Sequence, residues 1–231
     1  PVAFQKYVQP LMQASEEGLN LGHPRLKETS YILWSTLAKV YKEEFTPFLE
    51  GVVGALMTSL NQEESDLDFE IGEEARELLG DEVVIAGKKV KLVTPESKPE
   101  IDDLDNMEDD DDDEDWDDLT AVTAVALEKE VAIEVLGDVL TNTRKNFMPY
   151  FEKAIETIVV LVEHSYEGVR KAAIGTLWRA YACLWALMED HTGKKWSPGL
   201  PLKEQPSEEL LKLGEVVAAA TMSVWDDEVD R

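Results

Sequence analysis

The sequence contains little cysteine, little positive charge and no long apolar run. Cys183 is the single cysteine of the 231 residues, so no intrachain disulfide can form, and its apolar neighbours indicate a small core residue in a reducing compartment. No apolar run reaches the ~18 residues of a membrane-spanning helix, and no signal peptide is recognisable. Because the chain starts at Pro1 without methionine and stops in an acidic, helix-like segment, we expect it to be a piece of a longer protein.

The sequence also lacks the residue patterns of enzymes and metal sites. The segment 86–89 lacks the first glycine and the hydroxyl residue of a phosphate-binding loop. Asp66, Asp68 and Glu70 resemble the opening of a calcium loop, but Ile71 stands where that loop needs glycine. The histidines, which are not spaced as paired metal ligands and are expected to be surface or capping groups, are His23, His164 and His191. We therefore predict no catalytic residue, no metal site, no cofactor and no enzymatic activity.

Positive charge is scarce, because 22 Lys and Arg stand against 49 Asp and Glu, which gives a net charge of −27. Between Asp102 and Asp118 there are 13 acidic residues and no Lys or Arg. Like charge at that density opposes folding, so this acidic run is predicted to be solvated and mobile. Trp116 interrupts it and suggests a contact surface for a basic partner, while a solubilising spacer is the alternative. Its candidate cargo-binding residues are Asp109, Asp110, Asp111, Asp112, Asp113, Glu114, Asp115, Trp116, Asp117 and Asp118.

The acidic balance extends beyond the run, since the remaining residues also carry more acid than base. Phosphate groups would be repelled, so direct binding to nucleic acid or to an anionic membrane is not expected. Basic proteins are the favoured partners.

Apolar residues at three- and four-residue spacing predict an all-α fold. Before the acidic run, helices are expected at 4–17, at 25–45, and from Thr46 as the capping residue to about Leu60, with Pro47 in the first position. After the run, helices are expected at 120–140, 146–164 and 166–190, followed by a last helix capped by Ser207. Between these two groups, a short helix is predicted at 71–79 and a small β-hairpin at 82–93.

The helical segments repeat. The pairs Tyr7-Val8 and Leu11-Met12 recur as Phe48-Leu49 and Val52-Val53, 41 residues later, and Lys129 recurs as Arg170 at the same offset. Two further matches, Pro47 with Pro149 and Lys27 with Lys129, are offset by 102 residues. A period near 40 with two helices per unit is typical of HEAT or armadillo solenoids. The longer offset places an insertion within one helix pair.

The sequence thus predicts a single HEAT-repeat α-solenoid over 1–231, of about three and a half helix pairs, with a long acidic inter-helix insertion. The predicted units are a repeat at 1–45, a repeat at 46–142 with the insertion 61–118 (acidic loop 102–118), a repeat at 147–190, and the first helix of a further repeat at 207–231. A non-repeating helical bundle is the alternative.

Two side-chain rows are candidate binding surfaces. Glu130, Glu134, Asp138 and Asn142 follow one another at four-residue spacing, and acids in such a row repel unless a basic ligand or solvent faces them. Trp178, Tyr181 and Trp185 share one face of the next long helix. Such rings are often core, but when exposed they hold the aliphatic stems of Lys or Arg. Tyr31 and Trp34 could act in the same way.

These residues resemble a known family. The helix pairs with a 41-residue period, the VRKAA motif at 169–173, and the loop DDDDDEDWDDL at 109–119 resemble the karyopherin-β nuclear transport receptors (importin-β superfamily). The stretch IGEEARELLGDEVVIAGKKV at 71–90, with ALEKEVAIEVLGDVL at 126–140, looks most like the middle region of the importin-4 type and its fungal counterpart. The amino-terminal Ran-binding repeats of that family are not present.

The resemblance implies a function. It implies a fragment of a nuclear import receptor that shuttles between cytoplasm and nucleus, binds ribosomal proteins and histone tails through Lys/Arg-rich localisation signals on an acidic concave surface, and releases them to Ran-GTP. Ran and nucleoporin repeats would bind through the full-length receptor. By the resemblance, the second helix of each pair lines the concave side, which makes Glu130, Glu134, Asp138, Asn142, Trp178 and Trp185 cargo-binding candidates. An acidic HEAT scaffold and a histone-chaperone-like protein are the alternatives.

Overall fold

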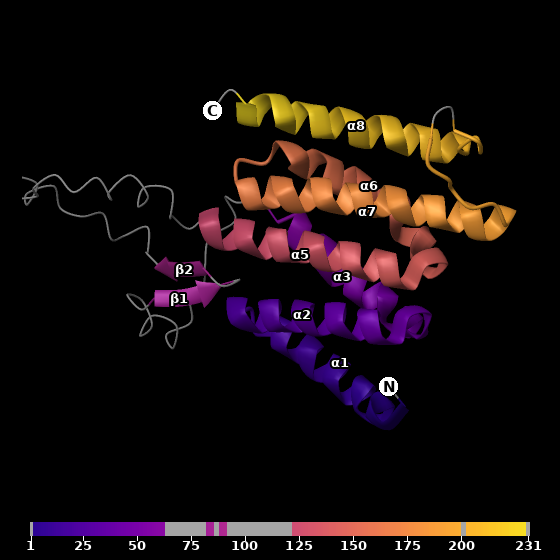
Figure 1. The fold of residues 1–231 in the computed structure, drawn as a ribbon. Coiled ribbons are helices and arrows are strands. Elements are labelled where there is room, and N and C mark those ends of the chain that lie inside the picture. Colours follow the sequence, from indigo (N-terminus) through magenta and orange to yellow (C-terminus); the bar gives the residue numbers. More distant parts are fainter. Residues whose placement is uncertain (1, 63–81, 86–87, 92–121, 200–201, 230–231) are drawn as a thin grey trace, which may run out of the picture.

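Helices account for most of the chain that the structure, a computed structural model, describes: residues 2–62, 82–85, 88–91, 122–199 and 202–229 (Figure 1). The α-helices are α1 (Gln5–Asn20), α2 (Pro24–Tyr41), α3 (Leu49–Leu60), α5 (Val122–Thr143), α6 (Met148–Val160), α7 (Glu167–Thr192) and α8 (Glu208–Val229). Short 3-10 helices, η1 (Val2–Phe4), η2 (Lys42–Phe48), η5 (Arg144–Phe147) and η6 (Leu161–Glu163), extend or join them.

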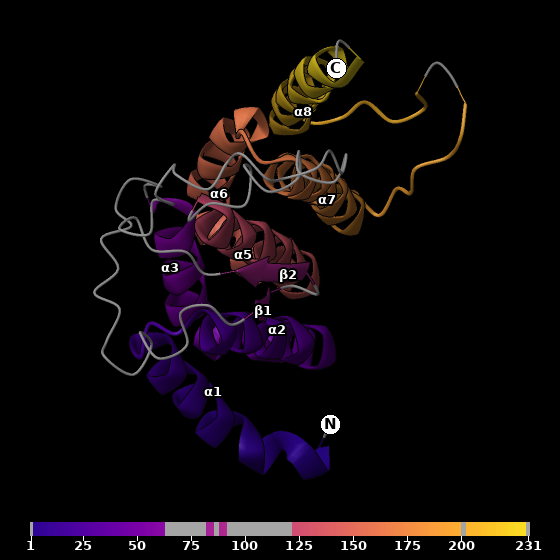
Figure 2. The same cartoon turned by 90° about the vertical axis from the view of Figure 1, so that its left-hand side faces the viewer.

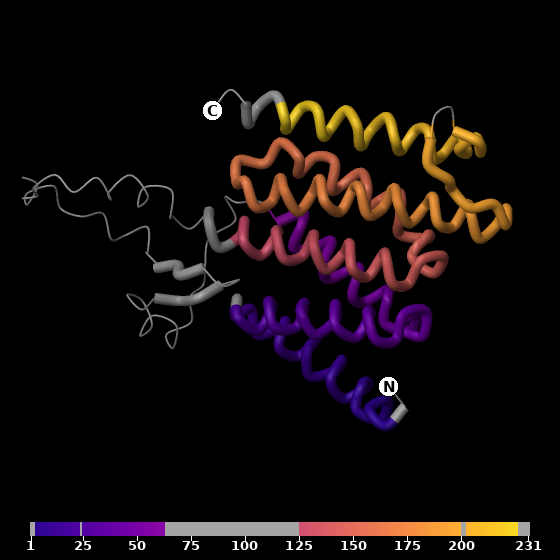
Figure 3. Tube along the Cα trace, in the orientation of Figure 1, coloured from indigo at the N-terminus to yellow at the C-terminus, as the bar shows by residue number. Residues whose placement is uncertain are grey.

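The helices form pairs that stack side by side. Helix α1 packs on α2, α3 on α5 and α6 on α7, while α2 also contacts α5, and α5 contacts α7. The Cα traces of α2, α5 and α7 lie next to one another (Figure 3). The stack curves, with α3 and α6 on its outer side and α2, α5 and α7 on its inner side (Figure 2). This is the all-α HEAT-repeat solenoid that the sequence predicts.

We call α2, α5 and α7 the inner helices and α1, α3, α6 and α8 the outer helices. Helix α5 is central, because it touches both neighbouring inner helices and α3. Its apolar residues therefore surround most of the helix: Leu127, Ile133, Leu136 and Leu140 are each at most 1% exposed. A buried leucine contributes about 1.5–3 kcal/mol, so α5 anchors the hydrophobic core. Cys183 belongs to that core as expected, and burial raises the pKa of its thiol.

The turns between inner and outer helices repeat in detail. Lys42 and Arg144, 102 residues apart, end α2 and α5 with φ angles of 51° and 50°, which non-glycine residues seldom adopt. Phe45 and Phe147, at the same offset, are both fully buried. Each packs on the aromatic ring three residues later, Phe45 on Phe48 and Phe147 on Tyr150. The offset read from the sequence is therefore also an offset in backbone conformation and packing.

Helix ends agree with the sequence in part. Ser207 caps α8, because its Oγ accepts from the backbone N–H of Leu210 at 3.3 Å. In the first turn of α8, hydrogen bonds from its own backbone N–H and from Ser207 lower the pKa of Glu209. His23 is a capping group as expected, since its Nδ1 atom accepts from the backbone N–H of Arg25 at the start of α2. His164 does not cap α7; its Nδ1 atom accepts from the backbone N–H of Tyr166 in the turn before that helix. The predicted start at Thr46 is wrong: its hydroxyl donates to the Glu43 carbonyl within η2, and α3 begins at Leu49.

The segment between α3 and α5 contains two paired strands, β1 (Glu82–Ile85) and β2 (Lys88–Lys91), at the place where the sequence predicts a hairpin. They are antiparallel, with Glu82 opposite Lys91 and Ile85 opposite Lys88. Strand β1 contacts α2, so the hairpin lies against the solenoid. The predicted helix at 71–79, the calcium-loop-like residues 66–70 and the acidic run 102–118 lie outside the described residues.

Candidate functional site: the inner helices

The predicted acidic row on α5 divides into residues with different surroundings. Glu134 is exposed on the inner side of α5. The carboxylate of Glu130 lies against Gly168 in the first turn of α7, where a helix amino terminus favours negative charge. Asn142 donates from Nδ2 to the backbone carbonyl of Asp138 at 2.7 Å. Of the two acids, Glu134 is therefore the one that presents its carboxylate to solvent.

Asp138 joins three inner helices. Its Oδ2 atom accepts from Ser35 Oγ of α2 at 2.7 Å and lies 2.8 Å from Lys39 Nζ of the same helix. Its Oδ1 atom lies 3.3 Å from Arg179 Nη1 of α7, and the same nitrogen donates to the Glu134 carbonyl. This carboxylate is thus already bonded to two cationic side chains and one hydroxyl group. The sequence row lacks lysines because the compensating charges lie on the neighbouring helices.

Other side-chain links join successive units of the solenoid at intervals that differ from the repeat offsets by one to five residues. Lys27 Nζ lies 3.1 Å from Glu128, its partner 101 residues away. Thr46 Oγ1 accepts from Asn146 Nδ2 at 2.7 Å, and Arg144 lies 3.1 Å from Asp190. Of the recurring bases Lys27, Lys129 and Arg170, Lys27 pairs with an acid of the next unit. Arg170 instead donates to the turn carbonyls of His164 and Ser165.

Charge is distributed unequally between the two sides of the solenoid. The inner helices contain eight acidic and seven basic residues, whereas the outer helices contain eleven acidic and three basic residues. The excess acid of the described helices therefore lies on the outer helices. An inner surface that attracts basic ligands would depend on local acids such as Glu134 and on the acidic run, rather than on the net charge of the inner helices.

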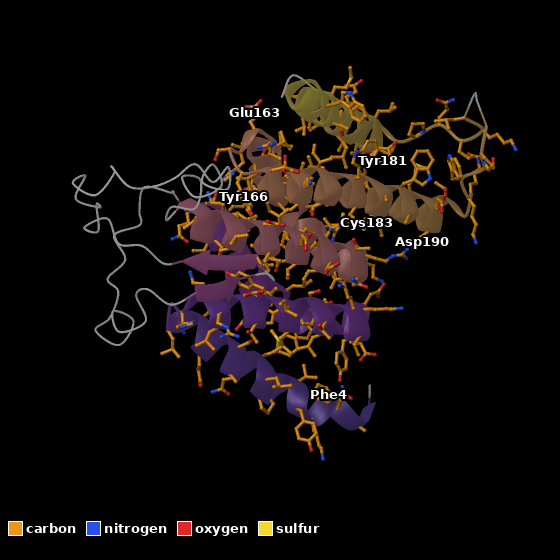
Figure 4. All side chains as sticks on the ribbon, turned by 60° about the vertical axis from the view of Figure 1, so that its left-hand side comes forward. Phe4, Glu163, Tyr166, Tyr181, Cys183 and Asp190 are labelled. Carbon is orange, nitrogen blue, oxygen red and sulfur yellow. The ribbon has the colours of Figure 1, made fainter. Side chains whose placement is uncertain are left out.

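The aromatic row on α7 faces α8. Trp178 is 45% exposed and donates from Nε1 to Thr221 Oγ1 of α8 at 3.1 Å. Tyr181 contacts the rings of Trp178 and Trp185 and lies over Gly214 of α8. Figure 4 shows Tyr181 on the α8 side of α7 and Cys183 nearer α5. The rings are therefore placed between two helices, with Trp178 still open to solvent.

The second pair of aromatic candidates, Tyr31 and Trp34, is not available for binding. Both are buried, at 2% and 3% exposure, with Tyr31 bonded to α3 and Trp34 to α1. Burial raises the pKa of Tyr31 to about 12. The hydrogen bond between its hydroxyl and Ser59 Oγ, at 2.5 Å, acts in the opposite direction and lowers the pKa. Trp34 donates from Nε1 to Ser15 Oγ of α1. Their helical spacing is that of core residues, and the proposed role in holding basic side chains is wrong.

A groove of about 840 Å³ lies at the carboxyl ends of α2 and α5. It contains the predicted residue Asn142 together with two exposed acids, Glu43 and Glu44, that the sequence row does not include. For Glu43 the sequence contained a signal, the repeat offset: Lys145 stands 102 residues later, and its Nζ atom lies 3.6 Å from the Glu43 carboxylate. A second groove, of about 660 Å³, lies between the outer helices α3 and α6.

Among the residues that the structure describes, no group of three His, Cys, Asp or Glu side chains is placed to hold a metal ion. Within the same ranges, no helix combines the length and the apolar character that crossing a membrane requires. The acidic run, whose residues are the other cargo-binding candidates, lies outside the described residues.

Comparison with known proteins finds a relative of this chain. The chain is 34% identical over 229 residues to a protein of Schizosaccharomyces pombe described as "Probable importin subunit beta-4". The alignment covers 99% of this chain and 20% of the relative, so the chain spans about a fifth of the relative's length. No protein-family profile matches the chain.

Proposed function

The chain belongs to the karyopherin-β family, as a segment of the importin-4 type, and we propose that it is part of a nuclear import receptor that binds basic cargo. The observation that carries this proposal is the alignment, which extends over nearly the whole chain and therefore across the insertion with its acidic run. The receptor would shuttle between cytoplasm and nucleus, with no enzymatic step.

The cargo would be recognised by charge. Ribosomal proteins and histone tails present clusters of Lys and Arg, and an acidic partner accelerates their association and orients them. The run at 109–118 supplies nine carboxylates, and Glu134 supplies an exposed carboxylate on the inner helix α5. Release by Ran-GTP and contact with nucleoporin repeats would involve the longer receptor.

The repeat division supports this placement of the run. We propose the units 1–45, 46–142 with the insertion 61–118, 147–190 and 207–231. The support is the correspondence of Lys42 with Arg144 and of Phe45 with Phe147 at an offset of 102 residues. In this division the acidic run belongs to the part of the sequence between α3 and α5.

A titration of a Lys/Arg-rich peptide tests the proposal. Kd would be measured at low and physiological salt for the chain, for a variant with 109–118 replaced by Gly and Ser, and for Glu134→Gln. We expect salt-sensitive binding, a large loss without the run, and a roughly two- to fivefold weaker Kd for Glu134→Gln, the size expected for one exposed ion pair. Glu152→Gln, on the outer helix α6, is the matched control and should bind like the wild type.

The two alternatives give different results in the same titration. If the variant without 109–118 binds no peptide and Glu134→Gln has no effect, the run alone carries the function, as in an acidic histone chaperone. If the unmodified chain binds no basic peptide even at low salt, the protein is a HEAT scaffold in which the run serves solubility.

A further inference from the structure

The connector between α7 and α8, residues 193–206, differs from the rest of the chain in charge and backbone. Its described residues form no helix or strand and lead away from the ends of the two helices (Figure 2). Three bases, Lys194, Lys195 and Lys203, stand against one acid, Glu204, in a chain whose net charge is −27. A basic, exposed loop on an acidic protein is suited to accept an added negative charge.

Ser197 supplies the hydroxyl group of this connector, and Pro198 follows it directly. A proline disfavours the helical conformation of the residue before it and favours an extended one. Gly199, whose φ angle of 119° is open to glycine, then bends the chain. Ser197 is partly exposed, and its Oγ atom makes no hydrogen bond to any residue that the structure describes. The hydroxyl is therefore free and lies in a non-helical segment.

Thr46 and Pro47 form a comparable pair in a different setting, inside the 3-10 helix η2. The Thr46 hydroxyl donates to the Glu43 carbonyl at 2.5 Å and accepts from Asn146 Nδ2 at 2.7 Å. Both the hydroxyl and the backbone of Thr46 are thus engaged in the fold, so the chain itself contains a matched control for Ser197. A third pair of this kind, at 94–95, lies outside the described residues.

Two contacts next to Ser197 hold the connector in place. Lys194 Nζ lies 2.9 Å from Glu204, so this ion pair joins the two ends of the connector. The pair is weak, because the Lys194 side chain is 63% exposed. The backbone N–H of Trp196 donates to the Glu189 carboxylate of α7 at 2.6 Å, which fixes the residue before Ser197 against that helix. A new charge on Ser197 would act on both contacts.

We propose that Ser197 is a phosphorylation site for a proline-directed serine/threonine kinase, and that the phosphate loosens the connector. Such kinases act on a hydroxyl that precedes proline in an accessible, extended segment, which is the setting of Ser197 and not that of Thr46. In the transfer, the Ser197 oxygen attacks the γ-phosphorus of Mg-ATP, and the kinase's catalytic carboxylate accepts the hydroxyl proton. A new O–P bond forms at Ser197, the bond between the γ-phosphorus and the β–γ bridging oxygen breaks, and ADP leaves.

The phosphate carries a charge of about −1.5 to −2 near neutral pH. It attracts Lys194 and Lys195, which stand three and two residues before it, and so competes with Glu204 for Lys194. It also repels the Glu189 carboxylate that accepts from the Trp196 N–H. Both contacts that hold the connector are therefore weakened. This consequence does not depend on the proposed function, because neither contact involves a basic ligand.

Kinase reactions on the folded chain and on two peptides test the site. The chain, a peptide of residues 190–204 and a peptide of residues 40–52 are each incubated with Mg-ATP and a cyclin-dependent or a mitogen-activated kinase, and the phosphate is located by mass spectrometry. We expect Ser197 to react in the chain within about fivefold of its rate in the peptide, and Thr46 to react at least about tenfold more slowly in the chain than in its peptide. Ser197→Ala should abolish the first signal, whereas Thr46→Ala should leave it unchanged.

Hydrogen exchange of the phosphorylated chain tests the consequence. Because its bond to Glu189 is weakened, the Trp196 amide should exchange several-fold faster than in the unmodified chain. Ser197→Ala treated with the same kinase is the control and should exchange like the unmodified chain.

Three results would overturn the proposal. The site is wrong if neither kinase places phosphate on Ser197 of the folded chain. The structural argument for it is wrong if Thr46 reacts in the chain as readily as in its peptide. The effect on the connector is wrong if phosphorylation leaves the exchange of the Trp196 amide unchanged. None of these measurements uses a basic peptide, so the phosphorylation site can fail while the peptide titration succeeds, and the reverse.

Discussion

Asp138 is the residue through which α2, α5 and α7 are linked. Its carboxylate accepts a hydrogen bond from Ser35 and forms ion pairs with Lys39 and Arg179, which lie on the two neighbouring helices. Because the pairs are partly exposed, each ion pair contributes about 0.2–1 kcal/mol. The hydrogen bond to a charged acceptor adds about 1.5–3 kcal/mol, part of which an amide would keep.

We predict that Asp138→Asn lowers the free energy of unfolding by roughly 1–2 kcal/mol, since both ion pairs are lost while a weaker bond to Ser35 remains. Urea unfolding measures the change, and added salt should reduce it. Glu134→Gln, one turn earlier and exposed, is the control and should stay within about 0.5 kcal/mol. An unchanged midpoint for Asp138→Asn would show that the three helices do not depend on this carboxylate.

The burial of Tyr31 should make the stability of the chain sensitive to alkaline pH. Its pKa is raised to about 12 in the folded chain, above the usual value near 10, so folding favours the neutral phenol. Its contribution to stability is fully present below pH ~10 and is lost as pH rises from about 10 to about 12. The unfolding midpoint should therefore fall over this window, and less so in Tyr31→Phe. Identical pH profiles for both proteins would exclude this role.

At the scale of helices, Gly137 sets the distance between α5 and α7. A methyl group there would lie 2.8 Å from Thr176 Oγ1 and 3.0 Å from Arg179 Nη1. We predict that Gly137→Ala destabilises the chain by about 1–2 kcal/mol, because crowding of about 1–3 kcal/mol outweighs a gain in helix propensity of up to about 1 kcal/mol.

Gly175→Ala is the matched control for this prediction. No atom lies within 4 Å of the position where its Cβ would be placed, so the substitution should stabilise α7 by about 0.5–1 kcal/mol. Both changes are read from urea midpoints. A stabilising Gly137→Ala would mean that the two helices separate easily and that their close contact contributes little.

The elements themselves were largely predictable from the sequence, because core positions recur at helical spacing and the units recur at 41 and 102 residues. What the helical pattern did not reveal is which neighbour a side chain faces. Asp138 looked like one member of a four-residue polar row on one helix, yet its partners lie on two other helices. Tyr31 and Trp34 were offered as surface rings, although helical spacing alone cannot distinguish a core row from an exposed row.

The repeat offset contains part of the missing information. The oppositely charged residues Asp138 and Arg179 are 41 residues apart, which is also the interval between the equivalent bases Lys129 and Arg170. The oppositely charged residues Glu43 and Lys145 are 102 residues apart. Pairs of opposite charge at a repeat offset occupy equivalent places on neighbouring helices and can therefore meet. Applied to the sequence, this rule would have found Arg179 as a partner of Asp138 and Lys145 as the partner of Glu43, but not Lys39, which lies 99 residues before Asp138. It would not have found the hydrogen bond between Trp178 and Thr221, whose interval is 43 residues.

For the whole molecule, the unequal charge of the two sides is the main constraint on function. The inner helices are nearly neutral, while the outer helices and the acidic run hold the excess acid. A basic ligand on the inner side would therefore depend strongly on the run.

Photo-crosslinking in the complete receptor locates the ligand most directly. A Lys/Arg-rich localisation peptide with a photoreactive group would be bound, irradiated and mapped by mass spectrometry, with and without Ran-GTP. We predict crosslinks to the run 102–118 and to the inner face around Glu134, and their loss when Ran-GTP is added. Crosslinks confined to the outer helices α3 and α6, or unchanged by Ran-GTP, would contradict the account.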